Sequence, residues 1–199
     1  MNRERPAGWA GITAAVLTVT GLVTLLVFFA TGLPLLGALN DLNTVAMSVV
    51  TVPIALALYP VAARGPSPLA AIALGADFIG VALAAVFSLL LVAGVVTFNS
   101  SLLPVTLGNG LIGIWLLLTA GLLLARSALP AALGWLGVAG GAGLAVSALA
   151  FPALGREHPI IGIAGLSALI GLVGFDAWMG VLLLQGRVPP LPGSPRHLT

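Results

Sequence analysis

The sequence contains no cysteine and no lysine, and it has few charged residues of any kind. Without cysteine the chain forms no disulfide, offers no thiolate nucleophile and holds no metal through sulfur. Without lysine it cannot bind retinal or pyridoxal phosphate as a Schiff base. Charged residues make up 6% of the chain and hydrophobic residues 60%, whereas a typical soluble domain is about 25% charged. A chain this apolar cannot cover its surface in water, so we predict that its solvent is lipid.

Several kinds of functional site are also missing from the sequence. Neither of the two histidines, His158 and His197, lies in an apolar run, so a membrane haem with two axial histidines is not supported. The five acidic residues are too few and too scattered for a two-metal centre, and no HExxH, Walker or GxGxxG motif occurs. No basic patch predicts a nucleic-acid partner. We therefore expect no metal and no cofactor, and an enzyme is the least favoured functional class.

Long apolar runs separated by short polar breaks dominate what the sequence does contain. A bilayer core of roughly 30 Å requires about 20 apolar residues in a helix, and six runs reach that length. They predict an all-α, polytopic membrane protein, and the Ala-, Gly-, Leu- and Arg-rich usage favours the inner membrane of a bacterium. The predicted organisation is a leader at 1–7, a membrane domain at 8–186 with spans at about 8–31, 41–63, 69–98, 105–125, 131–151 and 160–185, and a disordered Pro-rich tail at 187–199.

The arginines predict how these six helices are threaded through the membrane. Cytoplasmic segments of membrane proteins carry an excess of arginine and lysine. With both termini in the cytoplasm, the outside segments contain only Arg156. The cytoplasmic segments then contain the other six arginines, Arg3, Arg5, Arg64, Arg126, Arg187 and Arg196. We therefore predict that both termini are cytoplasmic.

Two acidic residues, Asp77 and Asp176, lie well inside apolar spans. A charge at the centre of a membrane helix costs roughly 2.5–3.5 kcal/mol, so such a residue is a candidate functional group. Both lie about 12–15 Å from the cytoplasmic side, so they are a candidate pair for a proton, a cation or an amine. The alternative is that each is a hydrogen-bonded structural carboxyl. The strings Gly75–Val81 and Gly174–Val181 are similar, as in inverted repeats of transporters, although chance also explains so short a match.

Small residues predict where helices approach one another closely. Gly137, Gly141 and Ala145 follow one another at four-residue spacing, which is typical of tight helix packing in membranes. Asp77 shares a stripe with small residues of its own helix, which places it toward protein rather than lipid. These faces serve either packing within the bundle or a homo-oligomer.

A second set of polar residues lies near the predicted outer surface. Asp41 stands where an N-cap or first-turn acid of the second span is expected. These residues line the mouth of a pocket, or they are polar because helix ends meet headgroups and water. The set is Asp41, Asn43, Asn99, Asn109, Arg156, Glu157 and His158.

The pattern of Asn109-Gly followed by Ile-Trp-Leu-Leu-Leu, then Arg126-Ser and Leu129-Pro130, then Leu133-Gly-Trp-Leu-Gly137, carries a resemblance. It resembles small six-helix bacterial membrane proteins grouped as the domain of unknown function 4386, across most of the chain. That resemblance implies the six-helix fold and transfers no activity or site residue.

The protein is expected to be embedded in the lipid bilayer, and two hypotheses for its function follow. In one, the intramembrane acids handle an ion or a small hydrophobic or cationic ligand. In the other, the chain is a structural or accessory subunit that packs into a homo-oligomer or a larger membrane complex.

Overall fold

A computed structural model of the chain describes residues 4–64, 67–155 and 158–188. It is all α-helical, as predicted. The six helices are α1 (Glu4–Thr31), α2 (Pro34–Ala62), α3 (Pro68–Val92), α4 (Phe98–Ala125), α5 (Ala131–Leu154) and α6 (Pro159–Leu184). Each is long and apolar enough to cross a membrane, which makes the chain a multi-pass membrane protein.

The first two helices begin earlier than the sequence pattern predicts. The predicted leader is partly helical, because α1 starts at Glu4. Helix α2 starts at Pro34 after the extended Leu33. Proline suits the first turn of a helix because its φ is already fixed near the helical value and because the N–H that it lacks would have no partner there. The prediction that Asp41 caps α2 is therefore wrong, and Asp41 lies inside the helix.

The break between α3 and α4 also lies earlier than predicted. Helix α3 ends at Val92, and Gly94 in the following turn has φ 69°, a conformation that glycine adopts without strain. Thr97 and Ser100 then form a capping box that starts α4. Asn99, which was expected in the break, is therefore in the first turn of α4. Pro104 is accommodated inside that helix.

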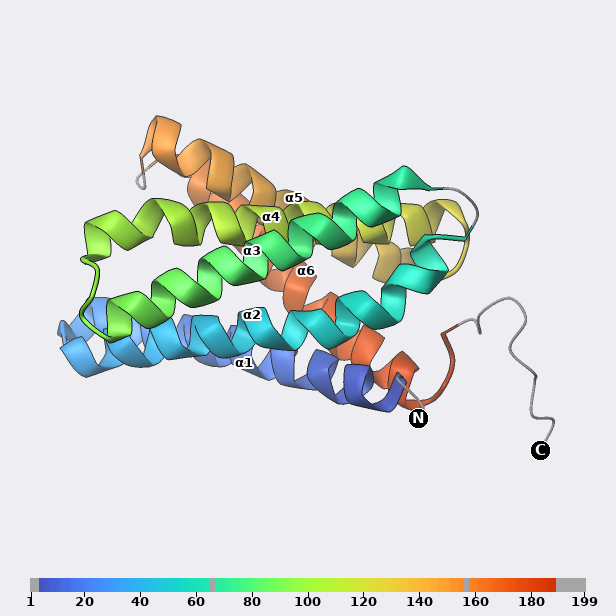
Figure 1. Ribbon diagram of the computed structural model, residues 1–199, viewed down its shortest axis with the longest axis horizontal. Helices are drawn as coiled ribbons and strands as arrows, with labels where there is room; N and C mark the ends of the chain where they lie inside the picture. Colours follow the sequence, from blue (N-terminus) through green and yellow to red (C-terminus); the bar gives the residue numbers. More distant parts are fainter. Residues whose placement is uncertain (1–3, 65–66, 156–157, 189–199) are drawn as a thin grey trace.

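The six helices form a closed ring (Figure 1). Each packs against its neighbours in sequence, α6 packs back against α1, and α2 makes a smaller contact across the ring with α4. We call the end at which α1, α3 and α5 begin and α2, α4 and α6 end the terminal end. The opposite end, with the α1–α2, α3–α4 and α5–α6 turns, is the far end.

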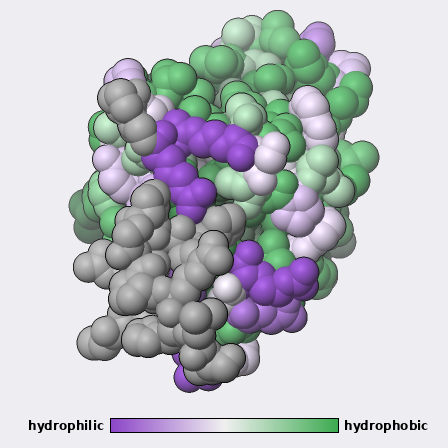
Figure 2. All heavy atoms as spheres, turned by 90° about the vertical axis from the view of Figure 1, so that its right-hand side faces the viewer, coloured by the Kyte–Doolittle hydropathy of each residue, from purple (hydrophilic) through white to green (hydrophobic). Residues whose placement is uncertain are grey.

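Described charged side chains gather at the terminal end, which is the face seen in Figure 2. Four arginines lie there, together with Glu4 in the first turn of α1. The flanks of the molecule around this face are largely hydrophobic, as a surface in contact with lipid tails requires. The four arginines are Arg5, Arg64, Arg126 and Arg187.

One of these arginines joins two helices at the terminal end. The guanidinium of Arg126, directly after α4, donates to the backbone carbonyl oxygens of Val61 and Ala62 in the last turn of α2. Carbonyls at a helix C-terminus have no partner within the helix and carry partial negative charge. Arg126 supplies both the donors and the opposite charge, so it fastens the end of α4 to the end of α2.

Glycines allow adjacent helices to cross at backbone contact. A Cβ added to Gly80 of α3 would lie 2.6 Å from the carbonyl oxygen of Gly108 in α4. A Cβ added to Gly180 of α6 would lie 2.7 Å from the carbonyl oxygen of Gly8 in α1. Real Cβ atoms do not approach so closely, so each crossing depends on the missing side chain.

The core is filled unevenly along the ring. The largest apolar side chains that are fully buried all lie in the half of their helix nearer the terminal end. Their counterparts in the far half are small residues, including the buried Ser88 and Ser101. Large side chains therefore fill the interior of the ring at the terminal end, whereas small residues line it at the far end and let neighbouring helices come into backbone contact there. The large buried residues are Ile54, Leu58, Leu116, Leu123, Leu133, Phe175, Met179 and Leu183.

Candidate functional site

Asp77 is fully buried near the middle of α3, at 0% exposure. It lies about 14 Å from the start of the helix and about 23 Å from its end. Neither carboxyl oxygen has a hydrogen-bond partner among the described residues. Buried polar groups in proteins are nearly always paired, so an unpaired one requires an explanation.

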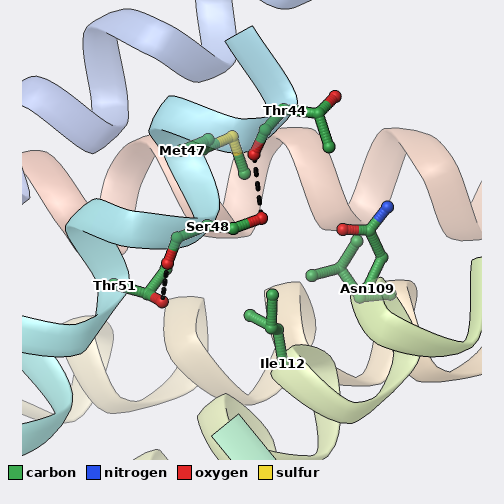
Figure 3. Close-up of a pocket in the computed structure, with 7 residues that line it drawn as sticks. Thr44, Met47, Ser48, Thr51, Asn109 and Ile112 are labelled. Carbon is green, nitrogen blue, oxygen red and sulfur yellow. Dashed lines mark hydrogen bonds between the residues drawn. The ribbon is translucent and has the colours of Figure 1, made fainter. Parts of the chain in front are cut away.

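A pocket of about 130 Å³ lies between α2, α4 and α5 (Figure 3). It is formed by helices α2, α4 and α5, with residues about 15–25 Å along each helix from the far end. Three hydroxyl side chains of α2 line one wall, and the Asn109 amide of α4 lines the other. The lining residues are Thr44, Met47, Ser48, Thr51, Asn109, Ile112 and Leu144.

The hydroxyl groups on this wall donate their hydrogens to the backbone of their own helix. Thr44 donates to the carbonyl oxygen of Asn40 at 3.1 Å, and Ser48 donates to that of Thr44 at 2.8 Å. Thr51 donates to the carbonyl oxygen of Ser48 at 2.8 Å. A hydroxyl has one hydrogen and two lone pairs, so each of these oxygens keeps lone pairs for a ligand. The α2 wall therefore presents hydrogen-bond acceptors.

Thr51 connects the pocket to the buried acid. Its side chain lines the pocket and also interacts with the carboxyl group of Asp77 across the α2–α3 interface. Its hydrogen is directed at Ser48 in this arrangement, which leaves the carboxyl oxygens of Asp77 without a hydrogen bond. Rotation of the Thr51 hydroxyl would bring Asp77 into the same hydrogen-bonded chain.

The electrostatic character of the pocket follows from these groups. Its α2 wall offers acceptor oxygens, Met47 adds a thioether sulfur, and an acid lies one side chain behind the wall. No basic side chain is among the residues that line it. Such a pocket suits a cation or a neutral molecule rich in hydrogen-bond donors, and it disfavours an anion.

Asp176 does not join this site. It is 5% exposed on α6, and Gly11 of α1 packs against its backbone carbonyl. Within the described part of the chain, α3 and α6 do not pack against each other, and neither acid interacts with the other. The structure therefore does not bring Asp77 and Asp176 together as the pair that the sequence suggested, because the intervening helices separate α3 from α6 around the ring.

The predicted outer cluster is dispersed rather than gathered in one site. Asp41 borders a separate apolar groove between the ends of α1, α2, α3 and α4. Asn43 donates to the carbonyl oxygen of Leu17 in α1 at 3.0 Å. Asn99 is exposed, whereas Asn109 lines the pocket.

His158 has a local role at the start of α6. Its Nδ1 accepts a hydrogen bond from the backbone N–H of Ile160 at 3.3 Å, which makes it the N-cap of the helix. Arg156 and Glu157, which were expected in the same cluster, lie outside the described residues. So do residues 1–3 of the leader and 189–199 of the tail.

The small residues of α5 are in contact with the helices on both sides of it. Gly137 faces Ala120 of α4 and Phe175 of α6, and Gly141 lies against the backbone of Gly113 and Leu117 in α4. This face is thus covered within the bundle and is not available to a second subunit.

Ala145 belongs to the same contact. Its backbone nitrogen would lie 2.8 Å from a Cβ added to Gly113 of α4. The predicted packing stripe of Gly137, Gly141 and Ala145 therefore meets α4 along its length.

The sequence reading missed the hydroxyl wall of α2. Thr44, Ser48 and Thr51 are spaced so that they share one face of a helix, and this spacing is visible in the sequence. Singly, threonine and serine are common in membrane helices, where they bond to their own backbone. Only the position of α2 beside Asp77 and Asn109 turns the stripe into one wall of a pocket.

No family model, curated protein or solved structure matches the chain. The resemblance to the domain of unknown function 4386 therefore stays a prediction. Within the described residues, no three histidine or acidic side chains gather where they could hold a metal ion.

Proposed function

We propose that the protein binds a small monovalent ammonium cation in the pocket of α2, α4 and α5, with Asp77 as its counter-charge. The observation that carries this proposal is the buried, unpartnered carboxyl directly behind a wall of acceptor oxygens. An unpaired acid in a membrane helix is costly, and a cation that donates hydrogen bonds relieves that cost.

The shape of the pocket limits the ligand to a few non-hydrogen atoms. A cavity of 150 Å³ in another protein holds one benzene molecule, and this pocket has about 130 Å³. Ile112 and Leu144 line its apolar side, which suits a short alkyl chain. Butylammonium combines such a chain with a charged donor group.

We also propose that the terminal end faces the cytoplasm and that the membrane is a bacterial inner membrane. The four described arginines at that end support this orientation by the positive-inside rule. The ligand pocket then lies near the middle of the membrane, and the part of the ring that is lined by small residues faces the outside.

Calorimetric titration of the purified protein with butylammonium tests the proposed site. We expect binding of butylammonium and no comparable binding of 1-butanol or butyrate, which match its chain but lack the positive charge. Asp77→Asn keeps the size of the side chain and removes its charge. Asp77 lies behind Thr51 and does not line the pocket, so its charge acts on the ligand through space in surroundings of low dielectric constant, and we expect the affinity for butylammonium to fall by roughly 10-fold.

Asp176→Asn is the matched control, because it neutralises the other buried acid outside the pocket. Thr51→Val is a second test, since it preserves shape and removes the hydroxyl that joins the pocket to Asp77. The affinity of Thr51→Val for butylammonium should fall by roughly 3- to 10-fold, because the variant loses about one neutral hydrogen bond to the ligand. Equal binding by the wild type and by Asp77→Asn contradicts the proposal, as does preference for butyrate.

A further inference from the structure

The ring consists of two three-helix halves that run in opposite directions. Helix α1 begins at the terminal end, whereas α4 begins at the far end (Figure 1). Equivalent helices have similar lengths, with 28 residues each in α1 and α4, 29 and 24 in α2 and α5, and 25 and 26 in α3 and α6. Exchanging the halves therefore also exchanges the two ends of the molecule.

When the two halves are exchanged, each contact between neighbouring helices of the ring corresponds to another contact that is also present. The α1–α2 contact corresponds to α4–α5, the α2–α3 contact to α5–α6, and the α3–α4 contact to the closing α6–α1 contact. In both the α3–α4 and the α6–α1 contact a glycine of each helix lies against the backbone of the other, although the α3–α4 crossing is near the middle of α3 and the α6–α1 crossing is near the terminal end. Three-helix halves that are related in this way occur in the inverted repeats of many secondary transporters.

One contact breaks the symmetry. Helix α2 touches α4 across the ring, but in the described part of the chain its equivalent, between α5 and α1, is absent. The α2–α4 contact is fastened at the terminal end by Arg126, and the large buried side chains lie in the same half. The interior of the ring is thus closed at the terminal end by large side chains and by Arg126, whereas small residues line it at the far end.

The pocket lies between the two halves. Thr44, Ser48 and Thr51 come from the first half, and Asn109, Ile112 and Leu144 from the second. A relative movement of the halves therefore changes the walls of the pocket and the route by which it is reached. Pro53 and Pro60 interrupt the hydrogen bonds of α2 just beyond the pocket, and prolines of this kind allow a membrane helix to bend.

We infer that the protein transports its ligand by exposing this pocket to each side of the membrane in turn. The inference rests on the proposed ammonium site. The structure is the state closed at the terminal end. In the second state α1 packs against α5 at the far end, while α2 separates from α4 and Arg126 releases the end of α2.

The absence of cysteine allows the two states to be distinguished by single cysteines in the full-length chain. Leu123→Cys places a thiol in the fully buried core at the terminal end, and Met47→Cys places one in the wall of the pocket. Each variant is reconstituted in proteoliposomes and treated with a membrane-impermeant maleimide from either side. Uptake of radiolabelled butylammonium is measured in the same vesicles.

In the absence of butylammonium, we expect the maleimide to label Met47→Cys when it is added at the far end. Under the same condition we expect it to label Leu123→Cys only slowly. During butylammonium exchange, Leu123→Cys should react from the terminal end at least 5-fold faster, and labelled butylammonium should accumulate. Asp77→Asn introduced into the Leu123→Cys chain should abolish both changes. Ala120→Cys, at a smaller buried position of α4, replaces Leu123→Cys if that variant does not fold.

The outcomes separate this inference from the proposed function. If butylammonium binds by calorimetry but neither crosses the membrane nor accelerates labelling, the pocket is a static binding site and transport is refuted. If butylammonium does not bind, the proposed function fails first and the inference falls with it. Labelling of Leu123→Cys that is rapid and independent of ligand contradicts the closed state.

Discussion

Arg126 illustrates how one residue serves two purposes. In the sequence it is an arginine in a short turn, where it contributes to the positive charge of one side of the membrane. In the structure its guanidinium also binds the free carbonyls of Val61 and Ala62. The half-buried position of this side chain makes the interaction stronger than that of an exposed ion pair.

We predict that Arg126→Gln lowers the stability of the folded protein by about 1–2 kcal/mol, because two carbonyls lose a charged donor. For a chain of this size, that corresponds to a fall in Tm of about 2–8 °C. Intrinsic tryptophan fluorescence during heating in detergent measures it. Arg187→Gln is the matched control, since Arg187 is exposed and its guanidinium donates to the side chain of Gln185 rather than to the end of another helix. An equal fall in Tm for both variants would show that Arg126 has no special role.

The helices themselves follow closely from hydropathy. Six spans are present, and their ends differ from prediction where local chemistry decides. Pro34 starts α2 and the capping box of Thr97 and Ser100 starts α4, and neither signal is visible in a count of apolar residues. In both places a polar residue that hydropathy assigns to a loop, Asp41 or Asn99, lies within a helix.

The candidate site was less predictable than the helices. Burial of Asp77 follows from its stripe of small residues, but its neighbours depend on the order of helices around the ring. The pairing of Asp77 with Asp176 was plausible from their equal depth in the membrane. Equal depth, however, says nothing about where two helices lie around the ring, and α3 and α6 are not in contact.

The crossing of α3 and α4 yields a prediction with an internal control. Gly80→Ala places a Cβ 2.6 Å from the backbone of Gly108, whereas a Cβ on Gly75 of the same helix meets nothing within 4 Å. Overpacking costs about 1–3 kcal/mol, while alanine is favoured over glycine in an open helix position by roughly 0.5–1 kcal/mol. Tm should therefore fall for Gly80→Ala and stay equal or rise for Gly75→Ala. The opposite order would contradict the crossing.

At the scale of the whole molecule, the orientation of the ring determines which side of the membrane the far end faces. Val95 is exposed in the α3–α4 turn at the far end, and Ser127 is exposed in the α4–α5 turn at the terminal end. Single cysteines at these two positions can be labelled in whole bacterial cells with an impermeant maleimide. We expect Val95→Cys to react in intact cells and Ser127→Cys only after permeabilisation. The reverse pattern would place the arginine-rich end outside and overturn the proposed orientation.

The whole molecule also explains why a small chain holds an unpaired acid in its interior. Its surface is committed to lipid, its helix faces are committed to close packing, and a group of polar side chains from α2 and α4 lines a pocket between the two three-helix halves. Both carboxyl oxygens of Asp77 are buried without a hydrogen-bond partner among the described residues, so the burial of this acid lacks the compensation of a hydrogen bond. A cation that enters the pocket supplies an opposite charge in its place.

Infrared difference spectroscopy of the reconstituted protein tests this central claim most directly. Addition of butylammonium should produce a difference signal in the carboxyl region as the environment of Asp77 changes. We predict that the signal is lost in Asp77→Asn and kept in Asp176→Asn. A wild-type spectrum without any carboxyl difference, or a signal that persists in Asp77→Asn, would contradict the role of Asp77 as the counter-charge of the ligand.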